Sequence, residues 1–145
     1  MAFRFTLATV LRVRESIERR EERALREIQL EMARVSRQID EIDANIAQSQ
    51  NARNHLLQQP IPAGQLQTML WEAQAAVEKR KALLQTLQAL EQQRNQQMQA
   101  YQAAHRDHET LINLEDEQRT AYELAQARAQ QKYLDDIFIA RHHRS

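Results

Sequence analysis

Between residues 28 and 56, apolar side chains recur at alternating steps of four and three residues. The predicted core positions are Ile28, Met32, Val35, Ile39, Ile42, Ile46 and Leu56. These steps average about 3.5 residues per turn, which keeps one narrow apolar face turned toward a partner helix. Most positions between them are charged or carry an amide. Because so narrow an apolar face does not stabilise an isolated helix, the pattern predicts a coiled coil.

The strongest helix breakers stand together at Pro60, Pro62 and Gly64. A proline in a helix interior lacks the amide donor and clashes with the preceding turn. This cluster predicts a turn at residues 59–64 between two long helices, at about 6–58 and about 63–140. The expected fold is all-α: one domain, residues 1–145, formed by an antiparallel helical hairpin.

The apolar pattern resumes after the turn, in a looser form. The predicted core positions of the second helix are Leu66, Leu70, Val77, Leu84 and Leu87. Folding the chain back about residue 61 puts residue i roughly opposite residue 122 − i. The second helix is then expected to extend past the first by roughly twenty residues, from Arg119 to Ile139, or about 30 Å.

Composition narrows the class of protein. Of 145 residues, 42% are hydrophobic and 28% are charged, with one Gly, two Pro and no Cys. This favours long helices over a globular core and excludes disulfides. Twenty basic residues balance twenty acidic ones, which argues against binding to nucleic acid or an anionic membrane. No apolar run approaches the ~20 residues that span a bilayer, so we expect a soluble cytoplasmic protein.

Candidate chemistry is sparse. His105 and His108 lie three residues apart, with Asp107 and Glu109 nearby, but two histidines are too few for a zinc site. One glycine does not make a phosphate-binding loop. A two-helix hairpin also offers no enclosed pocket for a catalytic group. We therefore expect no catalytic residue, no metal, no cofactor and no enzymatic activity.

The segment from Arg12 to Glu27 interrupts the apolar face, because Arg14, Glu18 and Glu21 occupy core positions. Two interpretations remain open. The segment is a solvated helix held by ion pairs four residues apart, such as Glu15–Arg19. Alternatively, its weakened packing and many guanidinium groups meet another protein.

The two ends of the chain carry a resemblance to a known family. The opening FRFTLATVLRVRE and the closing QQKYLDDIFIARHHR, together with the coil broken near its middle, resemble the flagellar export protein FliJ family and the related YscO-type proteins. The closing pattern comprises Lys132, Leu134, Asp135, Asp136, Ile137 and Arg141. The resemblance covers the whole chain.

The resemblance implies an antiparallel coiled coil similar to the rotor stalk of rotary ATPases. Such a protein sits in the centre of the hexameric, FliI-like export ATPase, promotes its assembly and activity, links it to the FlhA-like export gate, and escorts export chaperones. It is cytoplasmic and peripheral at the inner-membrane export apparatus, without inserting into the membrane.

The resemblance also implies a gate-binding face on both helices toward the turn. The matching positions are Gln38, Ile42, Met69, Ala73, Ala76 and Arg80. At Asn45 and Ser49 the same helical spacing leads us to expect aromatic residues instead. The alternative is that all of these are ordinary coil positions.

The ATPase contact is expected at the open end of the hairpin, where both termini lie. The candidate residues are Arg12, Arg14, Arg19, Arg23, Tyr133, Leu134, Ile137 and Phe138. Guanidinium groups suit carboxylates in the hole of a ring, and exposed apolar clusters mark binding surfaces. The alternative is that Phe3 and Phe5 fold onto Ile137 and Phe138, or that the tail is frayed.

Two other functions remain open. A generic structural or adaptor coiled coil would have an unbroken apolar face and would self-associate. A nucleic-acid-binding rod would carry a basic stripe. The polar interruption argues against the first, and the balanced charge argues against the second.

Overall fold

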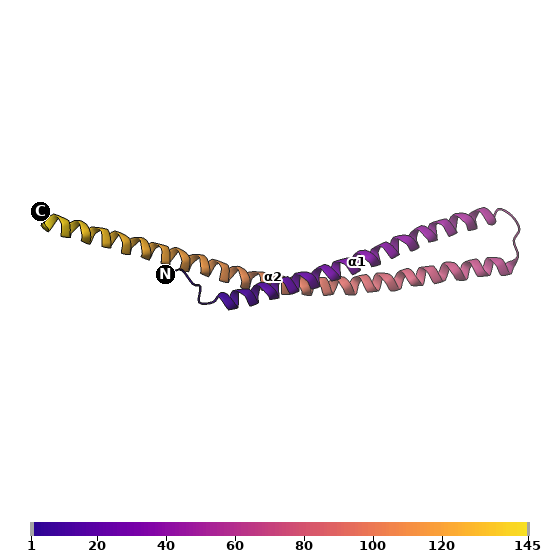
Figure 1. Ribbon diagram of the computed structural model, residues 1–145. Coiled ribbons are helices and arrows are strands. Elements are labelled where there is room, and N and C mark those ends of the chain that lie inside the picture. The colour runs from indigo at the N-terminus through magenta and orange to yellow at the C-terminus, as the bar shows by residue number, and fades with distance from the viewer. Residues whose placement is uncertain (1, 145) are drawn as a thin grey trace. The chain divides into compact units, whose positions relative to one another are not determined.

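The chain forms two α-helices in the computed structural model, which describes residues 2–144. Helix α1 spans Ala8–Leu56 and α2 spans Ala63–Arg144. Compared with the predicted ranges, α1 is shorter by two residues at each end and α2 continues four residues farther. No strand occurs among the described residues. The all-α helical hairpin is therefore confirmed (Figure 1).

The contacts divide the chain into two units. Unit 1 comprises Met1–Glu21 and Tyr101–Ser145, and unit 2 comprises residues 22–100. Both helices contribute to both units. No helix among residues 2–144 has a segment that is long and apolar enough to cross a membrane.

Unit 2 contains the turn and the best-packed part of the hairpin (Figure 1). Val35 is 3% exposed and Ile39 8%, and Leu25 is also buried. These three side chains lie on the face predicted from the steps of four and three. Burial of this face stabilises the pairing, because the rest of each helix is largely polar.

The chain reverses between Leu56 and Ala63. The carbonyl oxygen of Pro62 accepts hydrogen bonds from the amides of Gln65 and Leu66, at 3.1 and 3.2 Å, and so starts α2. Gly64 was expected in the turn, but it lies in the first turn of α2 with a negative φ angle. The two prolines therefore break the helix, and the glycine plays no conformational part.

The packing face of α2 differs from the prediction. Leu70 and Val77 were assigned to the core, yet they are 50% and 51% exposed. The predicted positions Leu66, Leu84 and Leu87 are half-buried, but between them the less exposed positions are Met69, Ala73, Ala76, Arg80 and Leu83. Near the turn, the bulky side chains of Leu70 and Val77 lie beside the packing face of α2, whereas the small side chains of Ala73 and Ala76 lie on it. Leu56 is also exposed, at 40%, because α1 ends there.

Unit 1 pairs the first turns of α1 with α2 and extends beyond them. Phe5 is buried. The ring of Phe3 lies 5.6 Å from that of Tyr122, and the Arg119 guanidinium lies 5.4 Å from the Phe3 ring centre. Phe3 thus packs on Tyr122, and the alternative that placed Phe3 against Ile137 and Phe138 is wrong.

Packing of Phe3 on Tyr122 shortens the unpartnered part of α2. Every residue from 123 to 144 is exposed except Ile137, which is half-buried. We call residues 123–144 the overhang. At 1.5 Å per residue it is about 33 Å long, and it begins four residues later than predicted.

Candidate functional site

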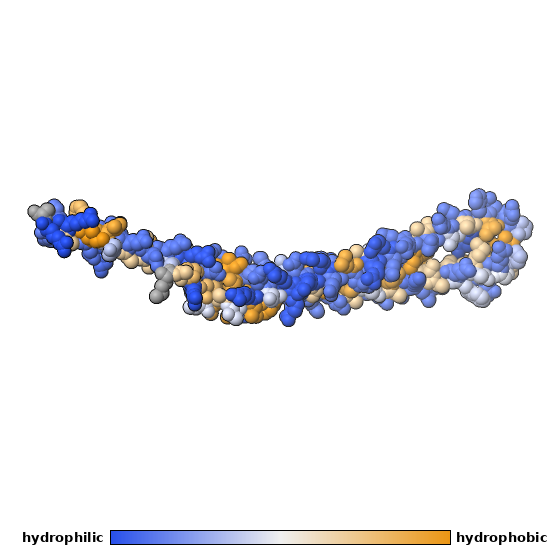
Figure 2. Space-filling model, in the orientation of Figure 1, coloured by the Kyte–Doolittle hydropathy of each residue, from blue (hydrophilic) through white to orange (hydrophobic). Residues whose placement is uncertain are grey.

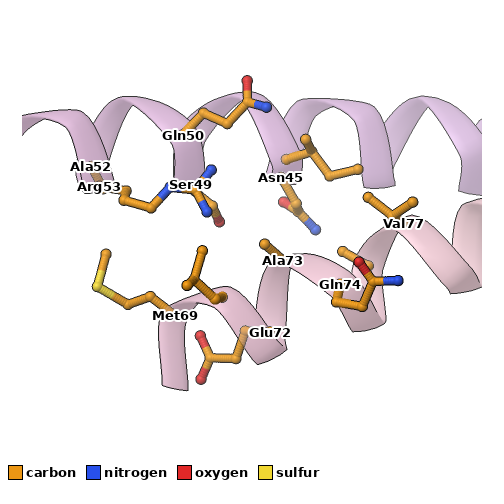
Figure 3. Close-up of a pocket in the computed structure, with 13 residues that line it drawn as sticks. Asn45, Ser49, Gln50, Ala52, Arg53, Met69, Glu72, Ala73, Gln74 and Val77 are labelled. Atoms are coloured by element: carbon orange, nitrogen blue, oxygen red, sulfur yellow. The ribbon is translucent and has the colours of Figure 1, made fainter. Parts of the chain in front are cut away.

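A cavity opens between α1 and α2 in unit 2, near the turn (Figure 3). Its volume is about 450 Å³, and most of its lining is apolar. It is lined from α1 by Asn45, Ile46, Ser49, Gln50, Ala52 and Arg53, and from α2 by Met69, Leu70, Glu72, Ala73, Gln74, Ala76 and Val77. Both helices thus contribute to a recess in the hairpin.

Small side chains on both helices create this cavity. Asn45 points from α1 toward α2, opposite Ala73, whereas Gln50 and Glu72 point away from the partner helix (Figure 3). In a coiled coil, a large side chain at each core position fills the space opposite it. Ser49, Ala73 and Ala76 leave that space open, so apolar surface of Met69 and Ile46 remains uncovered.

The structure brings most of the six gate candidates to this part of unit 2. Met69, Ala73 and Ala76 line the cavity. Next to it, the Arg80 guanidinium forms an ion pair with Asp43 across the two helices, at 2.5 Å. Ile42 is half-buried, and Gln38 is exposed. Four of the candidates thus belong to the packing face of α2, and only Gln38 is a plainly outward-facing position.

Sequence analysis missed Asp43 and Arg53 as parts of this region. Asp43 lies opposite Arg80, as the relation 122 − i places it to within one residue. Asn45 and Ser49, where aromatic residues were expected, line the cavity. The relation 122 − i therefore predicts which residues of the two helices lie opposite each other. Applied to every polar residue, it would have indicated the Asp43–Arg80 ion pair.

The overhang of unit 1 carries a second candidate surface. Tyr133, Leu134, Phe138 and Ile139 are all more than half exposed, with Phe138 at 71%. Figure 2 shows apolar side chains gathered at the C-terminal end of α2. An exposed apolar cluster on a helix without a partner is typical of protein-binding surfaces, which makes this stretch a candidate.

The four arginine candidates are not equivalent. Arg14 is half-buried and pairs with Asp107 of α2 at 3.4 Å. Arg19 pairs with Glu15 four residues earlier on α1, as expected. Arg12 is exposed in unit 1, and Arg23 is exposed in unit 2. Of the four candidates, Arg12 and Arg23 are the two without an ion pair among residues 2–144. Arg14, in contrast, connects the two helices of the hairpin.

Ligand-binding chemistry is limited in the described part of the chain. No group of three or more His, Cys, Asp or Glu side chains among residues 2–144 is arranged to hold a metal ion. His105 and His108, considered above as a metal pair, instead both approach the Glu18 carboxylate. The two candidate binding surfaces are therefore the cavity near the turn and the apolar overhang.

Comparison with known proteins identifies the family of the chain. The family model of the flagellar FliJ protein matches residues 3–145, essentially the whole chain. No curated protein matches the sequence, and no solved structure matches it. The chain therefore belongs to the flagellar FliJ protein family, which indicates a component of the flagellar export apparatus.

Proposed function

We propose that this protein is the stalk-like coiled coil of the flagellar type III export apparatus. In this proposal it binds the ring of the export ATPase, promotes the ring's assembly and activity, and couples it to the export gate. It acts in the cytoplasm, peripherally at the inner membrane. Escort of export chaperones belongs to the same proposal; it follows from the family and is tested by co-purification with an export chaperone.

The observation that carries the proposal is the overhang. A stalk in the hole of a ring needs a helical end that is free of its hairpin partner, and residues 123–144 supply one. The exposed side chains of Tyr133, Leu134 and Phe138 provide apolar contact area. The exposed Arg12, in the same unit, provides a guanidinium for carboxylates.

Hydrolysis by a purified export ATPase, with and without this protein, tests the proposal. A protein that contacts the assembled ring better than the free subunits shifts the equilibrium toward the ring. We therefore expect a severalfold rise in hydrolysis rate, largest at ATPase concentrations where the ring is only partly assembled. An unchanged rate across the whole concentration range would overturn the ATPase part of the proposal.

We place the gate contact at the cavity in unit 2. The uncovered surface of Met69, Ala73 and Ala76 suits an apolar side chain from a partner, and the Arg80–Asp43 pair supplies polar groups beside it. Gln38 is an exposed polar residue of α1, about two helical turns farther from the chain reversal than the cavity. Interfaces commonly combine an apolar anchor with a polar rim. The gate protein is the partner that the family implies for this face.

Filling the cavity should separate gate binding from stability. Replacing Ala73 by leucine adds three carbons to a space of about 450 Å³, so the packing of the hairpin should improve and its thermal midpoint should rise. Affinity for the gate protein should fall by about tenfold or more, because the anchor pocket is occupied. Calorimetric titration and thermal denaturation measure the two effects.

Two further variants control this experiment. Ala44→Leu adds the same carbons at an exposed position of α1 and should leave gate affinity unchanged. A double variant, Gln38→Ala with Arg80→Ala, removes two polar side chains of the proposed gate-binding face and should weaken binding without filling the cavity. Gate affinity equal to that of the unmodified protein in both Ala73→Leu and the double variant would remove this face from the interface.

A further inference from the structure

A polar cluster in unit 1 has no part in the proposed function. The Glu18 carboxylate of α1 lies between two histidines of α2. One oxygen is 3.0 Å from Nδ1 of His105, and the other is within hydrogen-bonding distance of Nδ1 of His108. Nδ1 of each histidine therefore donates to the same carboxylate.

This cluster occupies the packing face and not the outer surface. The side chains of Glu18 and His108 are only 16% and 18% exposed, whereas His105 is half-exposed at the edge. Glu18 continues the steps of four and three that also include Leu11, Arg14 and Leu25. A charged group at such a position weakens the pairing of the helices unless the opposite helix satisfies it.

The surrounding charges are mostly paired among themselves. Arg14 contacts Asp107, Arg19 contacts Glu15, and Arg20 contacts Glu21. His105 makes two further contacts: the ring of Tyr101 stacks on it, and the Glu109 carboxylate lies 3.5 Å from its Nε2. The charges of the two carboxylates that contact His105, Glu18 and Glu109, both favour its protonated form.

We propose that Glu18, His105 and His108 form a proton-responsive clasp that sets how firmly the first turns of α1 are held on α2. A neutral histidine donates an ordinary hydrogen bond to Glu18, and a protonated one donates a stronger, charge-assisted bond. Proton binding therefore tightens the pairing, and proton loss loosens it without abolishing it.

The sign of the effect follows from linkage. The hydrogen bond that His105 donates to the Glu18 carboxylate raises the pKa of His105 above its ordinary value of 6.5. The stability gained is therefore fully present below the unfolded-state pKa and is lost as the pH rises through the higher folded-state pKa. The hydrogen bond from His105 likewise lowers the pKa of the Glu18 carboxyl, against the effect of burial. Its contribution is lost only as the solution becomes strongly acidic.

Amide hydrogen exchange of residues 11–21 in the full-length chain measures the clasp. After correction for intrinsic exchange rates, protection should fall about three- to tenfold between about pH 5.5 and about pH 8.5. Nuclear magnetic resonance of the histidine rings in the same samples should show His105 titrating above 6.5. In Glu18→Gln, the His105 midpoint should return toward that value and the pH dependence of protection should disappear.

Matched variants keep the test decisive. Glu15→Gln removes a carboxylate about one turn from Glu18 that pairs with Arg19 of the same helix. This variant should keep the pH dependence of protection seen in the unmodified protein. His105→Gln changes a half-exposed side chain and retains the His108–Glu18 contact, so it should reduce the pH dependence even if Glu18→Gln disturbs the helix. Equal protection at both pH values in the unmodified protein, or the same fall in Glu18→Gln and His105→Gln, would overturn the proposal.

Discussion

Replacing Ile39 by aspartate is expected to lower the free energy of unfolding by about 3–5 kcal/mol. Ile39 is 8% exposed on the packing face of α1 in unit 2, beside the equally buried Val35. An aspartate there loses the apolar burial of isoleucine and places a carboxylate in a face that is shielded from water. Urea denaturation followed by circular dichroism at about 222 nm measures the loss.

The matched control is Ala44→Asp, which introduces the same carboxylate at an exposed position of α1. Its cost should be limited to helix propensity, roughly 0.5 kcal/mol. If Ile39→Asp cost no more than Ala44→Asp, the face described here would not be the one that pairs the helices.

Deleting residues 130–145 is expected to abolish stimulation of the export ATPase while leaving the hairpin folded. The deletion removes the exposed cluster of Leu134, Phe138 and its neighbours. It spares Phe3, Arg119 and Tyr122, whose contacts end the paired part of unit 1. Hydrolysis assays measure the stimulation, and circular dichroism verifies that the remaining chain is helical.

Point variants locate the effect within the overhang. Leu134→Ser with Phe138→Ser removes apolar groups one turn apart and should remove most of the stimulation. Gln131→Ser with Lys132→Ser changes the same number of nearby polar side chains and should have little effect. Full stimulation by the truncated protein would show that the overhang is not the contact.

The hairpin itself was predictable because two strong local signals agree. The prolines at 60 and 62 have no place in a helix interior, and the steps of four and three in α1 specify a packing face. Residues such as Val35 and Ile39 were therefore placed correctly by pattern alone.

The packing face of α2 was harder to predict. A reading of the sequence selects the bulkiest apolar side chains, and near the turn these are Leu70 and Val77. The structure instead packs Ala73 and Ala76 against α1. Small side chains give a weak periodic signal, and only the placement of the opposite helix decides between two adjacent faces. The cavity follows from this choice, so it could not be predicted either.

The overhang was foreseen, but its start was not. Its length depends on where the N-terminal segment stops covering α2, and the irregular residues 2–7 have no periodicity that would place Phe3 against Tyr122. The contact of Glu18 with His105 lies within one residue of the relation 122 − i. It was missed because each residue had been considered on its own helix.

The carboxylate of Glu18 also affects which partner α1 accepts. If two copies of α1 aligned in parallel, equivalent core positions would meet, and Glu18 would face Glu18 while Arg14 faced Arg14. Like charges in contact destabilise such a pair. In the hairpin, the same side chains meet His105, His108 and Asp107. The polar interruption of the core thus disfavours a parallel pairing of two α1 helices relative to the intramolecular hairpin.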